Sequence, residues 1–178
     1  MAVCTLNRDL LKSTNCGYSL PTITDIYLAN YNEVTSVAIS AGTGDDEGCE
    51  IVTGITMESG KTWYHIEPQK DSVTFTDELT VGDSGNKYRT HTLTWTNGGS
   101  YDACMHGVLD ALSLGRYVAV VKNAEGNYLM MGRIGGLEAE SASLNGGDTN
   151  GMITTLTANT TESTIPLNDA AIAVVTGA

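Results

Sequence analysis

The sequence has few charged side chains, and basic ones are the scarcest. Lys and Arg together number nine of 178 residues, whereas Asp and Glu number 21, which gives a formal net charge of −12. A nucleic-acid-binding protein needs Lys and Arg to displace the counterions of the phosphates, so this composition argues against such a role. Charged residues make up only 17% of the chain, below the usual value of about 25%. A surface with so few charges, mostly of one sign, indicates extensive contact with other protein chains.

The chain also lacks the cysteine spacings and apolar runs that mark several other classes of protein. None of its four cysteines belongs to a C-x-x-C motif; they are Cys4, Cys16, Cys49 and Cys104. Reduced thiols in an intracellularly made protein are therefore expected, with a Cys4–Cys16 disulfide as the alternative. Residues 1–16 contain no apolar segment of a signal peptide. The longest apolar run, residues 170–175, is too short to cross a membrane, and no membrane association is expected.

Catalytic and cofactor-binding motifs are missing as well. The sequence contains no G-x-S-x-G, no P-loop and no G-x-G-x-x-G. Residues 132–136 (GRIGG) resemble a phosphate-binding loop, but no helix pattern follows them. The histidines are scattered and none has a partner four residues away, as many helical metal sites do; they are His65, His91 and His106. We expect no enzyme, no cofactor and no metal site.

What the sequence does contain is a series of short strand patterns. Twenty Gly and only three Pro, with many Thr and Ser, predict numerous strands joined by tight turns. Residues 1–20 are predicted to form an N-terminal arm, which packs on its own domain or reaches a neighbour, and residues 21–178 a single β-rich domain. The predicted strands are residues 23–29, 33–40, 49–57, 62–68, 72–79, 87–96, 117–121, 128–131, 152–156, the polar stretch 159–162, and 170–175.

One segment predicts a helix, residues 101–114. Ser100 is the expected N-cap, Asp102 lies in the first turn, and Gly115 is expected to end the helix in the left-handed conformation. Four apolar residues fall at i, i+3, i+4 and i+7 and predict one buried stripe; they are Met105, Val108, Leu109 and Leu112. Because the rest of the chain offers only strands, this helix is expected to pack against a sheet. The fold class is therefore mainly β with one packed helix (α+β), an antiparallel sandwich or barrel.

A long hairpin is predicted from residues 72 to 96, with its turn at residues 82–86. On its second strand Thr90, Thr92, Thr94 and Thr96 share one side, which gives a polar, uncharged, β-favouring face. Such a face fits a surface that meets other subunits or a channel, and equally an ordinary solvated edge. The candidate oligomer or channel surface comprises Asp45, Asp46, Glu47, Glu78, Asp83, Thr90, Thr92 and Thr94.

The acidic loop of residues 41–48 also raises a calcium hypothesis. Its three consecutive carboxylates, Asp45, Asp46 and Glu47, cannot all point at one ion without a bent backbone, and the Asp-x-Asp-x-Asp-Gly pattern is absent. A solvated or subunit-facing loop is the favoured interpretation. Residues 145–151 (NGGDTNG) are similarly interpreted as hairpin turns rather than a cation loop.

Two segments carry a family resemblance. Residues 115–158 (GRYVAVVKNAEGNYLMMGRIGGLEAESASLNGGDTNGMITTLTA) resemble the strand, turn and glycine pattern near the C-terminus of the tail-tube family of tailed bacteriophages. Residues 16–34 (CGYSLPTITDIYLANYNEV) are similar to tail or ring proteins of crAss-like phages. The resemblance covers about residues 16–160, rests on turns and spacings, and offers no catalytic residue to transfer.

The resemblance implies a β-sandwich or barrel with one helix, closing into a homo-oligomeric ring, most often a hexamer, around the DNA channel of a phage tail or neck. The expected partners are further copies, other tail or neck proteins, and DNA that passes without specific binding. Such a protein is made in the host cytoplasm and resides in the virion. Six copies with a net charge of −12 each carry 72 net negative charges, which disfavours adhesion of a passing duplex.

Two other classes remain open from the sequence. The main alternative is an exterior capsid-decoration or receptor-binding module, for which a compact monomer or trimer is expected. The other is a small-ligand-binding β-barrel, which should have a tight apolar cavity and bind without assembling.

Overall fold

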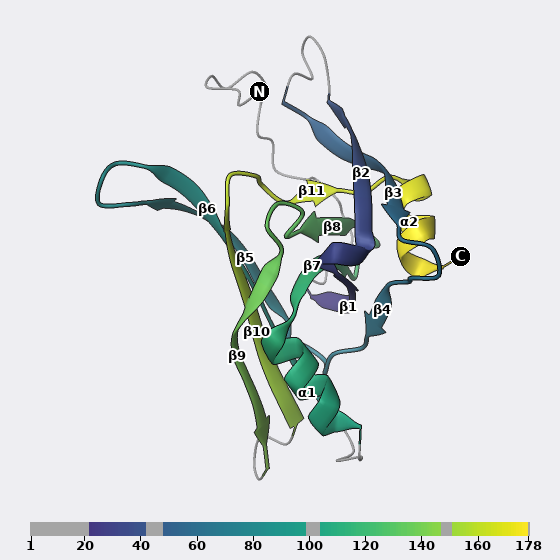
Figure 1. Ribbon diagram of the computed structural model, residues 1–178, viewed down its shortest axis with the longest axis vertical. Helices are drawn as coiled ribbons and strands as arrows, with labels where there is room; N and C mark the ends of the chain where they lie inside the picture. The colour runs from purple at the N-terminus through teal and green to yellow at the C-terminus, as the bar shows by residue number, and fades with distance from the viewer. Residues whose placement is uncertain (1–21, 42–47, 99–103, 147–150, 178) are drawn as a thin grey trace, which may run out of the picture.

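The computed structural model describes residues 22–41, 48–98, 104–146 and 151–177 (Figure 1). Antiparallel strands dominate it, in agreement with the predicted mainly β fold. The strands are β1 Ile23–Asn30, β2 Val34–Ala41, β3 Glu50–Met57, β4 Tyr64–Ile66, β5 Thr74–Val81, β6 Lys87–Asn97, β7 Arg116–Asn123, β8 Tyr128–Met131, β9 Leu137–Asn145, β10 Gly151–Thr160 and β11 Ile165–Pro166. The helices are α1 Met105–Leu114, α2 Asp169–Thr176 and the short 3-10 helix η1 Tyr31–Glu33.

Nine strands form one sheet and two form another. The large sheet runs in the order β11-β8-β7-β9-β10-β6-β5, with β1 pairing to β7 and β4; the small sheet is β2-β3. Val52 and Ile55 of β3 pack over the strands β1, β7 and β8, so the two sheets make a sandwich-like arrangement. The sheets do not close into a barrel, so the sandwich-like alternative of the sequence prediction is the one confirmed.

Strand β7 separates two hydrophobic cores. Ala119 and Val121 contribute to the core beneath β6 and β10, whereas Val118 and Val120 contribute to the core beneath β3 and α2. Because both of its faces are buried, β7 is a continuous apolar run rather than an alternating one. Each fully buried aliphatic side chain of this kind stabilises the fold by about 1.5–3 kcal/mol.

Helix α1 begins later than predicted. Its first residue is Met105, and the preceding Cys104 has helical backbone angles with no side-chain cap; Ser100 and Asp102 lie outside the described residues. The helix ends at Leu114 as expected, but Gly115 is extended (φ −89°) rather than left-handed. Glycine is required there for another reason, since a Cβ atom would collide with the ring and hydroxyl of Tyr117.

The predicted apolar stripe of α1 is buried only in part. Leu112 is 6% exposed and belongs to the core, and Leu109 packs against that core. Met105 is half-buried, whereas Val108 is 49% exposed, which corrects its predicted burial. The sheet contacts only one side of the stripe, and the other side lines a groove.

Helix α2 replaces the strand predicted at residues 170–175. The Asn168 side chain accepts a hydrogen bond from the Ala171 N–H at 2.9 Å, and Gly177 adopts the left-handed conformation (φ 72°) that ends the helix. These two caps favour a helix, although the β-branched residues between them favour a strand. Ala171 and Val175 pack against β3 in the second core.

Candidate assembly surface

One face of the large sheet is formed almost entirely by hydroxyl and amide side chains. The registers of β5, β6, β10 and β9 place Thr94 beside Thr74 and Thr155, and Thr155 beside Ser141. We call this surface the threonine face; its residues are Thr74, Thr76, Glu78, Thr80, Tyr88, Thr90, Thr92, Thr94, Thr96, Ile153, Thr155, Thr157, Asn159, Ser141 and Ser143.

Hydrogen bonds join the hydroxyls of the threonine face across its strands. Thr94 Oγ1 and Thr155 Oγ1 lie 3.0 Å apart, and Thr80 Oγ1 and Thr90 Oγ1 lie 2.9 Å apart. Thr90 also donates to Asn159 Oδ1 at 3.0 Å. These bonds partly satisfy the hydroxyls within the sheet, so the face is polar without attracting charge strongly.

The threonine face contains no Lys or Arg. At its corner on β7, Arg116 is neutralised by an ion pair with Glu138, whose Oε1 lies 2.5 Å from the Arg116 Nε. Glu78 lies on this face opposite Thr90, and Glu138 lies on it opposite Thr157. Apart from Arg116, which is paired with Glu138, the described residues of this surface offer a phosphate backbone no cation to bind.

The structure gathers several of the predicted surface residues. Thr90, Thr92, Thr94 and Glu78 all lie on the threonine face, while Asp83 lies in the exposed β5–β6 turn. The acidic-loop residues Asp45, Asp46 and Glu47 lie outside the described residues. Sequence reasoning missed the contributions of β9 and β10. The alternating residues of Ser141-Ala142-Ser143 and Thr155-Leu156-Thr157 were the available signal.

A buried polar cluster fixes the root of the β5–β6 hairpin beneath this face. The Asp77 carboxylate accepts hydrogen bonds from Arg89 Nε at 2.5 Å and from the Thr164 N–H at 2.9 Å, and His91 Nε2 lies 3.4 Å away. Burial opposes ionisation of Asp77, but the bonds from Arg89 and Thr164 and the charge of the neighbouring groups outweigh it and lower the pKa of Asp77 below 3.8. The cluster ties both hairpin strands to the chain between β10 and β11.

Both lateral borders of the threonine face carry backbone without a strand partner. Among the described residues β5 pairs only with β6, and residues 139–144 of β9 pair only with β10. Helix α1 packs beside β9, and its Leu112 joins the core opposite the threonine face. Unpaired edges of this kind are templates for strand addition from another chain.

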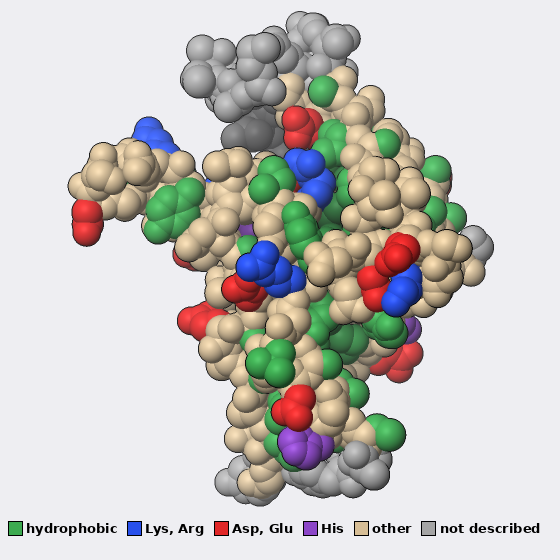
Figure 2. All heavy atoms as spheres, viewed as in Figure 1, with side chains coloured by type: hydrophobic (Ala, Val, Ile, Leu, Met, Phe, Trp, Pro, Cys, Tyr) green, Lys and Arg blue, Asp and Glu red, His purple; other side chains and the backbone are tan. Residues whose placement is uncertain are grey.

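The β5–β6 hairpin projects from the body of the molecule (Figure 1). Leu79 and Val81 near its tip are 60% and 57% exposed. Their strand-pair neighbours on β6 are Arg89 and Lys87, so apolar and basic side chains share one side of the tip. Figure 2 shows hydrophobic surface on this projection with a basic and an acidic group near it.

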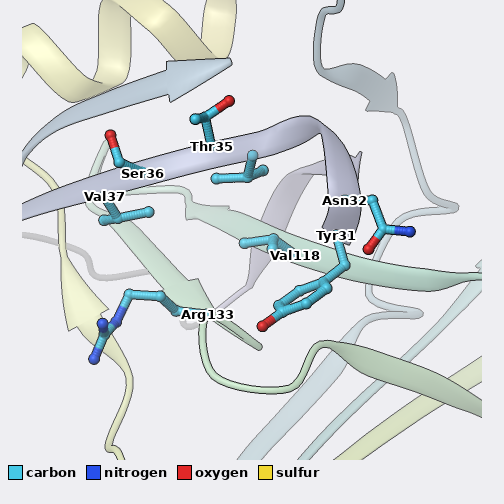
Figure 3. Close-up of a pocket in the computed structure, with 8 residues that line it drawn as sticks. Tyr31, Asn32, Thr35, Ser36, Val37, Val118 and Arg133 are labelled. Carbon is cyan, nitrogen blue, oxygen red and sulfur yellow. The ribbon is translucent and has the colours of Figure 1, made fainter. Parts of the chain in front are cut away.

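Two of the hollows in the described part of the chain could accept other molecules. A pocket of about 350 Å³ lies between β2 and β7 (Figure 3), with Tyr31 and Arg133 at one side. Arg133 is not available to a ligand's anion there, since its Nη2 lies 2.7 Å from the buried Glu162 carboxylate. The second is an apolar groove of about 570 Å³ between α1, β1 and β4, open to solvent. Neither is the enclosed cavity of the small-ligand barrel.

The described part of the chain holds neither a cluster of metal-ligating side chains nor a helix that could span a membrane. No group of three or more His, Cys, Asp or Glu side chains there could hold a metal ion. No helix among those residues has the length and apolar character to span a membrane.

Comparison of the chain with protein-family models, with curated proteins and with solved structures finds no match in any of the three. The case for a function therefore rests on the surfaces described above, together with the resemblance noted in the sequence.

Proposed function

We propose that this chain is a structural protein that assembles with copies of itself into a ring, with the threonine face as the inner wall. The observation that carries the proposal is the combination in one sheet of a face without cations and two unpaired borders. Each border needs a partner strand, and a second copy supplies one at either side.

The direction of the strands supports head-to-tail pairing. In the order β5-β6-β10-β9 every neighbouring pair is antiparallel. Since the number of strands is even, placing β5 of one copy beside β9 of the next continues the antiparallel alternation across the boundary. Contacts between two different surfaces of identical chains give closed rings when the rotation closes.

The dimensions suit a channel. Six copies, the number that the family resemblance implies, would give a wall of 24 strands. With strands spaced about 4.8 Å apart and tilted by about 40°, such a wall is about 50 Å across between backbones. Side chains on the inside narrow it further and leave room for a DNA duplex.

The chemistry of the wall suits passage of DNA rather than binding. The threonine face contributes hydroxyls and the Glu78 carboxylate, and the Arg116 at its corner is paired with Glu138, in a chain of net charge −12. A duplex in the channel therefore gains nothing from counterion release. With the sequence resemblance, this supports a place in the tail or neck of a phage virion, in contact with other structural proteins there.

The first test is solution mass by light scattering across concentration, followed by negative-stain imaging. Rings support the proposal. A compact monomer or trimer at every concentration would contradict it and favour the exterior decoration or receptor-binding module.

Variants of the two edge strands test the proposed pairing of β5 in one copy with β9 in the next. Thr74→Lys/Thr76→Lys places charges on the β5 edge and Ser141→Lys/Ser143→Lys on the β9 edge, and lysines protect sheet edges from pairing. Each variant alone should need at least about tenfold more protein to form rings. In a mixture of the two variants, the unaltered β9 edge of one can pair with the unaltered β5 edge of the other, but no third chain can add to that pair. The mixture should therefore stop at dimers.

The matched control is Thr92→Lys/Thr94→Lys, which adds the same charges to the same face on the interior strand β6. Rings should persist in this variant. Equal loss of rings in the control and the edge variants would contradict pairing through the edges.

A further inference from the structure

The hairpin tip presents an apolar surface that its own chain does not cover. Strand β10 pairs with β6 only as far as Thr160 and Arg89, and β5 and β6 continue beyond that point without it. Leu79 lies level with this last pair and Val81 lies beyond it, both on the side of the hairpin that faces the core at Phe75 and Leu93. The side of the hairpin that faces the core near Phe75 is therefore exposed to solvent near the tip. Two large aliphatic residues more than half exposed on a projecting hairpin favour a protein contact.

The apolar groove lies at the other end of the same strands. Its lining includes Asn97 at the end of β6 and Met152 near the start of β10, whereas the tip is adjacent to Lys87 at the start of β6. Ten residue steps separate Lys87 from Asn97, about 33 Å along an extended strand. Tip and groove therefore lie at opposite ends of the molecule along the strand direction.

The groove has the chemistry of a receptor for aliphatic side chains. Leu28, Met105 and Leu112 contribute to its lining, and Tyr64 and Val108 on its flanks are 56% and 49% exposed. It presents more apolar than polar surface. Its volume of about 570 Å³ exceeds what two aliphatic side chains fill, so a hairpin tip can enter without expansion of the groove.

The charges near the hairpin tip and the groove also favour contact between the two. Seven Lys and Arg residues lie in the described part of the chain, and five of them form ion pairs there. Lys87 at the tip is one of the remaining two. At the groove, the exposed Glu67 follows the lining residue Ile66, and its carbonyl accepts a hydrogen bond from Asn97. The turn carries Asp83, so the attraction to an acidic surface of another copy depends on Lys87, which lies beside Val81.

We propose that the tip of one copy, carrying Leu79, Val81 and Lys87, docks in the apolar groove of a second copy in an adjacent ring. This inference rests on the proposed ring. Edge pairing acts across the strands, while the tip–groove contact acts along them, so the two contacts use separate directions. A head-to-tail contact along the axis does not close on itself and stacks rings into a tube.

The native Cys104 provides the test, because it is exposed and lines the groove. In rings of the Val81→Cys variant, mild oxidation should join residue 81 of one copy to Cys104 of another, since docking brings their Cα atoms within disulfide range, about 5–6 Å. Peptide mapping should identify that link, and a ladder of covalent species should appear on non-reducing gels. The ladder should disappear in Val81→Cys/Cys104→Ser.

Val174→Cys on α2 is the matched control, since Val174 is 40% exposed and lies outside the tip and groove. It should give no link to Cys104. A second variant, Leu79→Ser/Val81→Ser, changes only exposed side chains and should keep single rings while raising at least tenfold the concentration needed for stacks.

The outcomes separate this inference from the ring itself. Rings that stack normally with serine at positions 79 and 81, or rings without an 81–104 link, overturn the tip–groove contact and leave the ring intact. A wild-type chain that forms no ring at all overturns the proposed function.

Discussion

Replacing Asp77 by Asn tests whether the buried cluster at the hairpin root holds β5 and β6 to the body. In the folded chain the Asp77 carboxylate accepts from Arg89 Nε at 2.5 Å and from the Thr164 N–H at 2.9 Å. The substitution keeps the size and one acceptor oxygen but removes the negative charge. It therefore isolates the electrostatic contribution of the cluster from its packing.

The loss of unfolding free energy expected for Asp77→Asn follows from the number of groups that donate to Asp77 and from their exposure. A hydrogen bond to a charged group contributes about 1.5–3 kcal/mol net. The Arg89 side chain is 36% exposed, so water compensates part of its loss, and the amide oxygen of Asn still accepts one of the two bonds. We expect Asp77→Asn to lower the free energy of unfolding at pH 7 by about 2–3 kcal/mol.

The pH dependence gives the sharper test. The folded-state pKa of Asp77 lies below the ordinary 3.8, so the unfolded chain binds this proton more readily than the folded one. The stability that Asp77 contributes is therefore complete above the unfolded pKa and is lost as the pH falls through the lower folded value. The difference between wild type and Asp77→Asn should be constant from pH 7 to about 5 and shrink below 3.8.

Urea unfolding followed by circular dichroism, at one protein concentration and several pH values, measures this difference. Asp110→Asn is the control, because Asp110 is 65% exposed and its ion-pair partner among the described residues is His106 on the same helix; it should change stability by less than about 0.5 kcal/mol. A difference for Asp77→Asn that is as large at pH 3 as at pH 7 would refute the electrostatic account.

Further predictions concern a glycine and the threonine face. Gly115→Ala forces a Cβ into the Tyr117 ring and should destabilise by about 1–3 kcal/mol in thermal unfolding, whereas Gly107→Ala, with open space at that position in α1, should stabilise by up to about 1 kcal/mol. Equal effects at the two glycines would contradict the close approach of Tyr117. Rings of Thr92→Lys/Thr94→Lys should retain duplex DNA in a salt-dependent manner while wild-type rings do not; salt-independent retention, or none, would argue against those residues facing the channel.

The elements that the sequence predicts well are those specified locally. The β5–β6 hairpin has a period-two pattern on both sides of a glycine-containing turn, and the structure places its strands within two residues of the prediction at each end. Strand β9, in contrast, contains Glu, Ala and Ser, which have low strand propensity. The sequence does not predict β9, because pairing with β10 rather than its own residues makes this segment a strand.

In β9 residues of low strand propensity form a strand; in α2 residues that favour a strand form a helix. The apolar, β-branched residues of α2 favour a strand, while Asn168 and Gly177 cap a helix. For the candidate surface, the alternation of residues 90–96 predicted one strand of the threonine face. Its alignment with Thr155 and Ser141 depends on the register between strands far apart in sequence, which a single sequence does not encode locally.

The position of β7 between two cores has a consequence for how the molecule opens. Val118 and Val120 on one side and Ala119 and Val121 on the other cannot lose their neighbours separately. The two halves are thus expected to melt as one cooperative unit, with the β7 amides exchanging with deuterium last, at rates set by global unfolding. The tip of the β5–β6 hairpin, beyond the end of β10, lies outside that unit, so its amides should exchange early in the isolated chain and become protected only when a neighbour covers them.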